Sequence, residues 1–377
     1  MTTVPAAPKG QAPATSRFDL GKILLEGRAF LALIVIFVVF TILAPQSYPT
    51  VGNILVMASH VSVYAILSIG MLLVILNGGI DLSVGSTLGL SGMVAGFLMQ
   101  GVKLGGVTLY PAVWVVVVIA LAVGALVGLV NGILVARLKV APFVATLGTL
   151  YAVRGLAELM TNGLTFSSLD GDPALGNTGF DWLGFNRILN VPIGVLVMIV
   201  VAVLVSLVLN RTVFGRWVYA SGGNERAAEL SGVPVRRVKV RVYVASGVCA
   251  AIAGVILASE LTSASPTAGT SYELTAIAAV VIGGAALTGG RGNIRGTLLG
   301  AFVIGFLSDG LVIVGVSAYW QTVFTGTVIV LAVLLNAVQY RGRRRAAQNG
   351  AGSPPSATAP STATAGADRT VLEKAAG

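Results

Sequence analysis

The chain has 377 residues, of which 55% are hydrophobic and only 10% are charged. Soluble domains carry about 25% charged residues, so this composition excludes an ordinary globular protein. The net charge of +10 does not indicate a nucleic acid partner, because Lys and Arg cluster in the loops and ends between apolar segments. We therefore expect an all-α integral membrane protein that crosses the bilayer several times.

A bilayer span needs about 20 mostly apolar residues, and ten segments of the chain approach that length. They are residues 29–44, 54–76, 82–100, 111–136, 141–160, 191–210, 241–261, 273–288, 296–315 and 320–340. The first is short and the eighth is rich in Ala and Gly, so nine or eleven spans also fit the sequence. We expect a polytopic helical bundle of about ten transmembrane helices, some of them broken, over residues 29–340.

The two ends of the chain differ in composition from this domain. Residues 1–28 form a Pro-, Ala- and Thr-rich lead, predicted to be partly disordered, without the pattern of a signal peptide. Residues 341–377 begin with a basic cluster and continue as a low-complexity tail, predicted to be disordered.

Basic residues also indicate the orientation in the membrane. With an even number of spans, the basic clusters before the first span, between the fourth and fifth, and after the last lie on one side. The loop at residues 211–241 lies on the same side and holds seven Lys or Arg against two acids. Such loops are cytoplasmic in membrane proteins, so both termini are predicted to be cytoplasmic. The external segment 161–190 contains Phe180, Trp182 and Phe185, which are predicted to lie at the membrane interface as an aromatic belt; contact with a partner is the alternative.

The 211–241 loop contains the signals of one very short helix. Asn224 is a preferred N-cap, Glu225 places a negative charge in the first turn, Gly232 favours termination and Pro234 prevents continuation. A helix of about two turns is not stable alone in water, so we expect it to pack against something else.

Two interpretations of this helix remain open. Ala227, Leu230 and Ser231 share one small face, which suits a groove on a partner protein. The helix is equally compatible with packing beneath its own membrane domain.

A second segment of interest joins the second and third spans. Adjacent Gly78 and Gly79, followed by Asp81, predict a broken helix whose backbone is buried in protein or lines a wet cavity. An ionisable group at such a place is costly unless it is paired, so Asp81 is a candidate for function. Capping of the third span is the alternative immediate role.

This segment is weakly repeated later in the chain. Six residues recur at one constant offset: Ala65, Ile66, Gly78, Gly79, Gly85 and Gly89 match Ala276, Ile277, Gly289, Gly290, Gly296 and Gly300. Chance matches compete in a chain this rich in Ala and Gly. If the breaks meet, a contact from Asp81 to Arg291 or Arg295 becomes an open possibility. Gly124 and Gly128 form a GxxxG pair, which predicts close helix packing.

The residues that catalysis requires are missing from the sequence. No Walker A motif occurs, because Gly21-Lys22 is followed by Ile23, and His60 is the only histidine. We predict that the chain is not an enzyme and holds no metal or cofactor. Polar residues within the spans are candidates to contact a hydroxylated solute, and they include Asn131, Thr146, Thr149, Glu158, Glu273 and Asp309. The candidate path or gating residues are Asn77, Asp81, Ser83, Thr146, Glu273, Gly289 and Gly290.

Four motifs in order resemble one known family. They are NGGIDLSVGS (77–86), PFVATLGT (142–149), FGRWVYASGGNERAAELSGV (214–233) and AAVVIGGAALTGGRGNIRGTLLGAF (278–302). Together they resemble the permease subunit of bacterial ATP-binding cassette importers for simple sugars, in the ribose, xylose and galactose group. The likeness covers nearly all of residues 29–340.

The resemblance implies a multi-pass protein of the bacterial cell membrane that translocates a monosaccharide or related polyol. It implies three kinds of partner: cytoplasmic ATPase subunits that use the ATP, an external solute-binding protein, and a second permease copy, expected to form a homodimer. Residues 224–232 would be the short cytoplasmic coupling helix, with coupling residues Gly223, Asn224, Glu225, Ala227, Ala228, Ser231 and Gly232. The alternatives are a branched-chain amino acid importer permease and an ion-coupled secondary sugar transporter, in which Asp81 would belong to a cation site.

Overall fold

The computed structural model describes residues 27–328, 330 and 334. These residues belong to one compact unit. Nearly all of the predicted N-terminal lead (1–28) and the whole of the predicted tail (341–377) lie outside the described residues.

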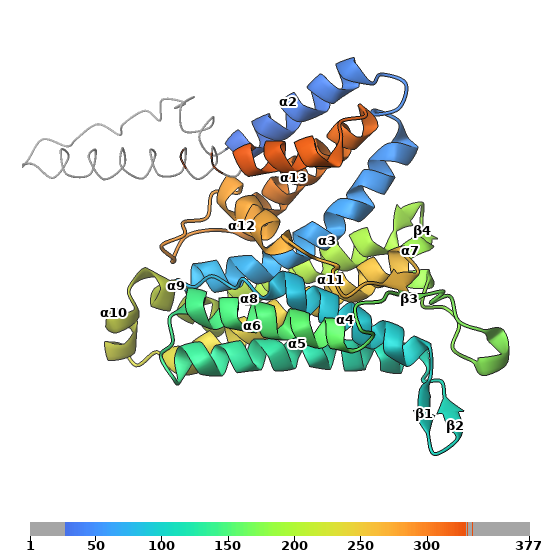
Figure 1. The fold of residues 1–377 in the computed structure, drawn as a ribbon. Helices are drawn as coiled ribbons and strands as arrows, with labels where there is room; N and C mark the ends of the chain where they lie inside the picture. The colour runs from blue at the N-terminus through green and yellow to red at the C-terminus, as the bar shows by residue number, and fades with distance from the viewer. Residues whose placement is uncertain (1–26, 329, 331–333, 335–377) are drawn as a thin grey trace, which may run out of the picture. The chain divides into compact units, whose positions relative to one another are not determined.

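The described part is mainly helical (Figure 1). The helices are α2 (Arg28–Leu43), α3 (Val51–Leu76), α4 (Val84–Met99), α5 (Val113–Ala136), α6 (Pro142–Leu159), α7 (Trp182–Phe185), α8 (Ile193–Arg211), α9 (Val213–Gly223), α10 (Glu225–Leu230), α11 (Val235–Glu260), α12 (Tyr272–Ile282) and α13 (Ile294–Ile313), with a 3-10 turn at Pro173–Leu175. Residues 318–328 are also helical and overlap the start of the predicted tenth span.

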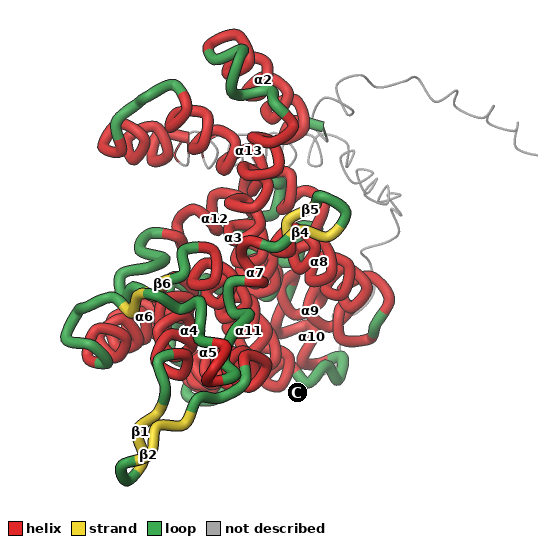
Figure 2. Tube along the Cα trace, turned by 90° about the vertical axis from the view of Figure 1, so that its right-hand side faces the viewer, coloured by secondary structure: helices red, strands yellow, loops and turns green. Residues whose placement is uncertain are grey.

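Among the described residues, short strands in the loops form two-stranded antiparallel ladders (Figure 2). The pairs are β1 (Val102–Leu104) with β2 (Val107–Leu109), β3 (Phe166–Ser167) with β6 (Ser263–Ala264), and β4 (Arg187–Ile188) with β5 (Val191–Pro192). Figure 1 shows these strands at the end of the helices opposite to α10. The basic loop and the loop strands therefore lie at opposite ends of the long helices.

Five helices of the described part are long and apolar enough to cross a membrane: α3, α5, α8, α11 and α13. Three shorter apolar helices, Ala29–Leu43, Val84–Met99 and Tyr272–Ile282, accompany them. The first nine predicted spans each coincide with a helix, but α12 ends at Ile282 rather than near 288, because Gly284 turns the chain with φ +91°. Several apolar helices of spanning length make this a multi-pass membrane protein.

Helix α3 lies at the centre of the described unit. It packs against α8, α11, α12 and α13, and its most apolar segment is 89% buried. Helix α11 packs against both α3 and α5 through small residues. A Cβ atom added at Gly124 or Gly128 of α5 would overlap backbone atoms of α11, so the predicted close packing of this GxxxG pair is confirmed.

The prediction for the external aromatic residues is wrong at one position. Trp182 and Phe185 are 46% and 61% exposed, as an interfacial position requires. Phe180 is completely buried, and its carbonyl oxygen accepts a 2.6 Å hydrogen bond from the Ser259 hydroxyl. Its ring packs with apolar side chains of the helices instead of meeting the interface, because the segment 161–190 folds back over α11.

Candidate functional site

The short helix predicted in the basic loop is present as α10, and its capping is confirmed. The Asn224 side-chain oxygen accepts a hydrogen bond from the amide of Ala227 at 3.0 Å, and Glu225 lies in the first turn. Gly232 adopts φ +84°, a left-handed conformation that suits glycine after a helix, and Pro234 follows. Caps at both ends therefore define this short helix.

The loop contains more helix than the sequence predicted. Helix α9 precedes α10, and Thr212 caps it by accepting a 3.2 Å hydrogen bond from the amide of Gly215. The prediction of one helix missed α9, because Gly222 and Gly223 were not recognised as the end of an amphipathic segment that Thr212 starts. Helix α11 already begins at Val235, so the last basic residues of the loop belong to its first turns.

Helix α10 has one face toward its own chain and one face toward solvent. Ala228 is buried, with 5% exposure, whereas Leu230 is 75% exposed. Ala227 and Ser231 are exposed as well. The two interpretations of the helix are thus compatible, because the helix packs on its own domain through Ala228 and leaves Leu230 uncovered.

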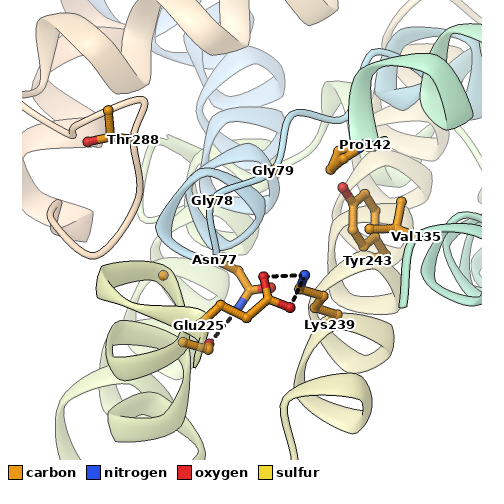
Figure 3. Close-up of a pocket in the computed structure, with 11 residues that line it drawn as sticks. Asn77, Gly78, Gly79, Val135, Pro142, Glu225, Lys239, Tyr243 and Thr288 are labelled. Carbon is orange, nitrogen blue, oxygen red and sulfur yellow. Dashed lines mark hydrogen bonds and ion pairs between the residues drawn. The ribbon is translucent and has the colours of Figure 1, made fainter. Parts of the chain in front are cut away.

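An ion pair connects α10 to α11. The Lys239 ammonium lies 2.7 and 2.8 Å from the two carboxylate oxygens of Glu225 (Figure 3). Lys239 is mostly buried at 17% side-chain exposure, while Glu225 is 56% exposed. The pair fixes the start of α10 against the first turns of α11.

Glycines join the loop to the two broken helices. The Gly290 amide donates a 2.9 Å hydrogen bond to the Leu76 carbonyl oxygen at the end of α3. A Cβ atom at Gly222 would overlap that same carbonyl, and one at Gly289 would lie 3.0 Å from the Cα of Gly78. The two Gly-Gly breaks of the weak repeat therefore meet each other, and the end of α9 packs directly onto them. We call Gly78, Gly222, Gly289 and Gly290 the glycine junction.

A cavity of about 200 Å³ opens beside the glycine junction (Figure 3). Its lining includes Asn77, whose side-chain amide donates a 2.6 Å hydrogen bond to the Ser221 hydroxyl. Glu225 and Lys239 line it from the loop, and Tyr243 lines it from α11. The predicted residue Asn77 thus connects the end of α3 directly to α9.

Asp81 lies deeper, with 1% exposure, and its carboxylate accepts three hydrogen bonds. Its Oδ1 atom accepts from the amide and hydroxyl of Ser83 at 3.0 and 2.7 Å. Its Oδ2 atom accepts from the Ser246 hydroxyl at 3.0 Å. Ser83 is the N-cap position of α4, so Asp81 satisfies the amide of the capping residue. The partners of Asp81 in these hydrogen bonds are Ser83 and Ser246, not Arg291 or Arg295. The two Gly-Gly breaks nevertheless meet at the glycine junction.

The network continues from Ser83 into α5 and α6. The Asn131 amide donates to the Ser83 hydroxyl at 2.8 Å, and the Thr149 hydroxyl donates to Asn131 Oδ1 at 2.7 Å. Thr146, another predicted residue, donates to the Ile80 carbonyl at 3.2 Å. Buried polar side chains thereby link the α3–α4 break to three other helices, all within one chain.

Glu273 lies apart from this network, at the start of α12, with its carboxylate close to Gly85 of α4. Near it is a residue that sequence reasoning missed, Arg154 of α6. Its guanidinium donates hydrogen bonds to the carbonyl oxygens of Pro266 and Ala268. A lone arginine inside an apolar segment was the available signal, since such a cation requires partners.

Comparison with known proteins identifies the family. A family model described as "Branched-chain amino acid transport system / permease component" matches residues 53–333. The chain belongs to this permease family. The match covers the glycine junction, α10 and the buried polar network, so these parts of the candidate site lie within the family domain.

The chain is also similar to curated sugar import permeases. The chain is 40% identical to a ribose import permease protein of Haemophilus influenzae over 331 residues, which are 88% of this chain and 98% of the relative. It is 43% identical to the ribose import permease protein of Escherichia coli K12, over 83% and 94% of the two chains. A galactose/methyl galactoside import permease protein of Salmonella typhimurium is 34% identical, over 85% and 96%. No solved structure matches this permease.

Proposed function

We propose that the chain is the membrane-spanning subunit of an ATP-driven importer for a monosaccharide, with D-ribose or a closely related sugar as solute. The observation that carries this proposal is the likeness to ribose import permeases over nearly their whole length. Translocation is its role, and a separate ATPase subunit performs the hydrolysis. This role requires no metal, nucleotide or nucleic acid bound to the chain itself.

The proposed docking element for the ATPase is α10. Its exposed Leu230 offers a large apolar side chain at the surface of a basic loop, which suits helix-in-groove binding. Its buried side is held by Ala228 and by the Glu225–Lys239 pair. Movement of the ATPase would thereby reach the glycine junction through α9.

The proposal includes an assembly and an orientation. Two copies of this chain form the translocation unit, an external solute-binding protein delivers the sugar, and the whole resides in a bacterial cell membrane. About ten spans cross the bilayer, and both termini lie in the cytoplasm. The positive charge of the α9–α11 region supports this orientation.

An amino acid importer is the main competitor, because the family description includes branched-chain amino acids. The relatives named above are sugar permeases, which favours a sugar. The test is reconstitution of the permease in proteoliposomes with its cognate ATPase and solute-binding protein. We expect ATP-dependent uptake of radiolabelled D-ribose and none of L-leucine.

The same assay separates primary from secondary transport. Uptake of D-ribose should stop when ATP is omitted, even with an ion gradient and membrane potential imposed. Persistent uptake under those conditions would contradict the ATP-driven mechanism and favour the ion-coupled alternative.

A further inference from the structure

A group of polar and aromatic side chains gathers far from the loop, around the outer half of α3. His60 lies about 14 Å along α3 from Val51, at 1.5 Å per residue. Its Nδ1 atom is 3.3 Å from both carboxylate oxygens of Asp309 on α13. The His60 side chain is 48% exposed and that of Asp309 is 19% exposed.

Two tyrosines and a second carboxylate complete the group. Tyr64 follows His60 by one helical turn, and its ring centroid is 4.8 Å from that of Tyr272, the first residue of α12. Glu260, at the end of α11, interacts electrostatically with both His60 and Asp309. We call these five residues the outer polar cluster. They come from four different helices, so the fold as a whole assembles the cluster.

The surroundings of this cluster limit what it can face. An ionisable pair within a membrane span is costly against lipid, and such residues face a water-filled cavity or the interior of a bundle. His60 remains half exposed, although most residues that follow it in α3 are buried. The exposed side of the cluster must therefore face an aqueous path or another protein.

The chemistry of the cluster suits an uncharged solute with many hydroxyl groups. The carboxylate of Asp309 accepts hydrogen bonds, and the tyrosine hydroxyls both donate and accept. Since Nδ1 of His60 donates to Asp309, Nε2 of the neutral ring remains to accept from a solute hydroxyl. The Tyr64 and Tyr272 rings add flat apolar surface. Such a mixture, a few polar groups among aromatic rings, is typical of small-molecule sites.

We propose that the outer polar cluster lines the translocation path and makes transient hydrogen bonds to the sugar as it passes from the external side. This inference rests on the proposed function, since it requires a sugar to move along this chain. It assigns the path to α3, α11, α12 and α13, whereas the buried network around Asp81 holds helices together within the chain.

Cysteine accessibility tests the location of the path, because Cys249 is the only cysteine of the chain and is buried. In a Cys249→Ala background, His60→Cys is compared with Ile199→Cys, which is 47% exposed on α8. Both variants are assembled with the ATPase in nanodiscs, so that a charged, water-soluble methanethiosulfonate reaches both faces. We expect the cysteine at position 60 to react at least ten-fold faster than that at position 199.

Two outcomes would overturn the proposal: equal modification rates at positions 60 and 199, or a slower rate at position 60 than at position 199. In either case the cluster would face lipid or a partner protein. Should His60→Cys fail to assemble, Tyr64→Cys is measured against the same control. Assembly is judged by co-elution with the ATPase on size exclusion.

Uptake tests the contact with sugar. We expect Tyr272→Ala to lower ATP-dependent uptake of radiolabelled D-ribose at least ten-fold, while Tyr319→Ala, which removes an 87% exposed tyrosine, retains it. If Tyr272→Ala retains uptake, the proposed contact between Tyr272 and the sugar is wrong. Lack of uptake by the unmodified protein would instead contradict the proposed function, so the two failures are distinguishable.

Discussion

Gly222 lies so close to the carbonyl of Leu76 that no side-chain atom fits between them. The Leu76 carbonyl accepts the Gly290 amide at the same place, so three segments of the chain share one backbone contact. The atom in the way belongs to the backbone, and a flexible side chain cannot relieve the overlap by moving.

We therefore expect Gly222→Ala to separate α9 from the end of α3 at a cost of about 3 kcal/mol, the upper part of the range for overpacking. Gly223→Ala is the matched control, because nothing lies within 4 Å of a Cβ atom at Gly223. The measurement is thermal stability in detergent, by size exclusion after heating. Equal stability of the two alanine variants would show that the contact between Gly222 and Leu76 is not tight.

The exposed side of α10 gives a second prediction. Leu230→Glu places a charge on the surface proposed to enter the ATPase groove, while Ala228 and the caps still hold the helix. We expect co-purification with the ATPase to fall at least ten-fold without loss of membrane insertion. Leu189→Glu, at a 92% exposed position outside this loop, should have no effect on the ATPase. Full ATPase binding by Leu230→Glu would exclude α10 as the docking helix.

The Glu225–Lys239 pair should contribute little to stability, because Glu225 is more than half exposed. Solvent screens a pair with one exposed partner, so its contribution is about 1 kcal/mol at most and Lys239→Gln should change the melting temperature only slightly. Its expected effect is on coupling, since α10 loses its attachment to α11. The ratio of ATP hydrolysed to ribose imported should rise, and the double exchange Glu225→Lys with Lys239→Glu should restore it. A large thermal shift in Lys239→Gln would assign the pair a structural role instead.

Asp81 offers the opposite case, a buried group with three hydrogen bonds. Asp81→Leu leaves the hydroxyls of Ser83 and Ser246 without their acceptor, which costs about 2 to 3 kcal/mol. Asp81→Asn keeps an oxygen for Ser83 and should cost about 1 kcal/mol. Heating in detergent should rank the wild type above the Asn variant and the Asn variant above the Leu variant. If the Asn and Leu variants unfold together, the carboxylate charge is the essential feature rather than the hydrogen bonds.

Local signals in the sequence were sufficient for part of this structure. The length and apolarity of the spans predicted a helical membrane domain, and the caps around Asn224 and Gly232 predicted α10. These features depend on residues close in sequence, whose propensities act before any tertiary contact forms. The roles of the predicted coupling and path residues remain predictions.

Other features depend on contacts between distant segments. Nothing near Asp81 in the sequence indicates Ser246 as its partner. Charge alone predicts that a carboxylate pairs with an arginine rather than with a serine. Phe180 was expected at the interface because aromatic residues in external loops often lie there, but the fold of the segment buries it. The glycine junction likewise requires α9, whose existence the pair Gly222-Gly223 obscured.

Helix α11 carries the Glu225–Lys239 pair near one end and Glu260 at the other. Its 26 residues form a rod about 39 Å long. A tilt of about 5° around its midpoint displaces each end by about 1.7 Å in opposite directions, given that length. With the orientation proposed above, such a tilt would connect the position of the ion pair on the cytoplasmic side to the position of the Glu260 carboxylate on the external side.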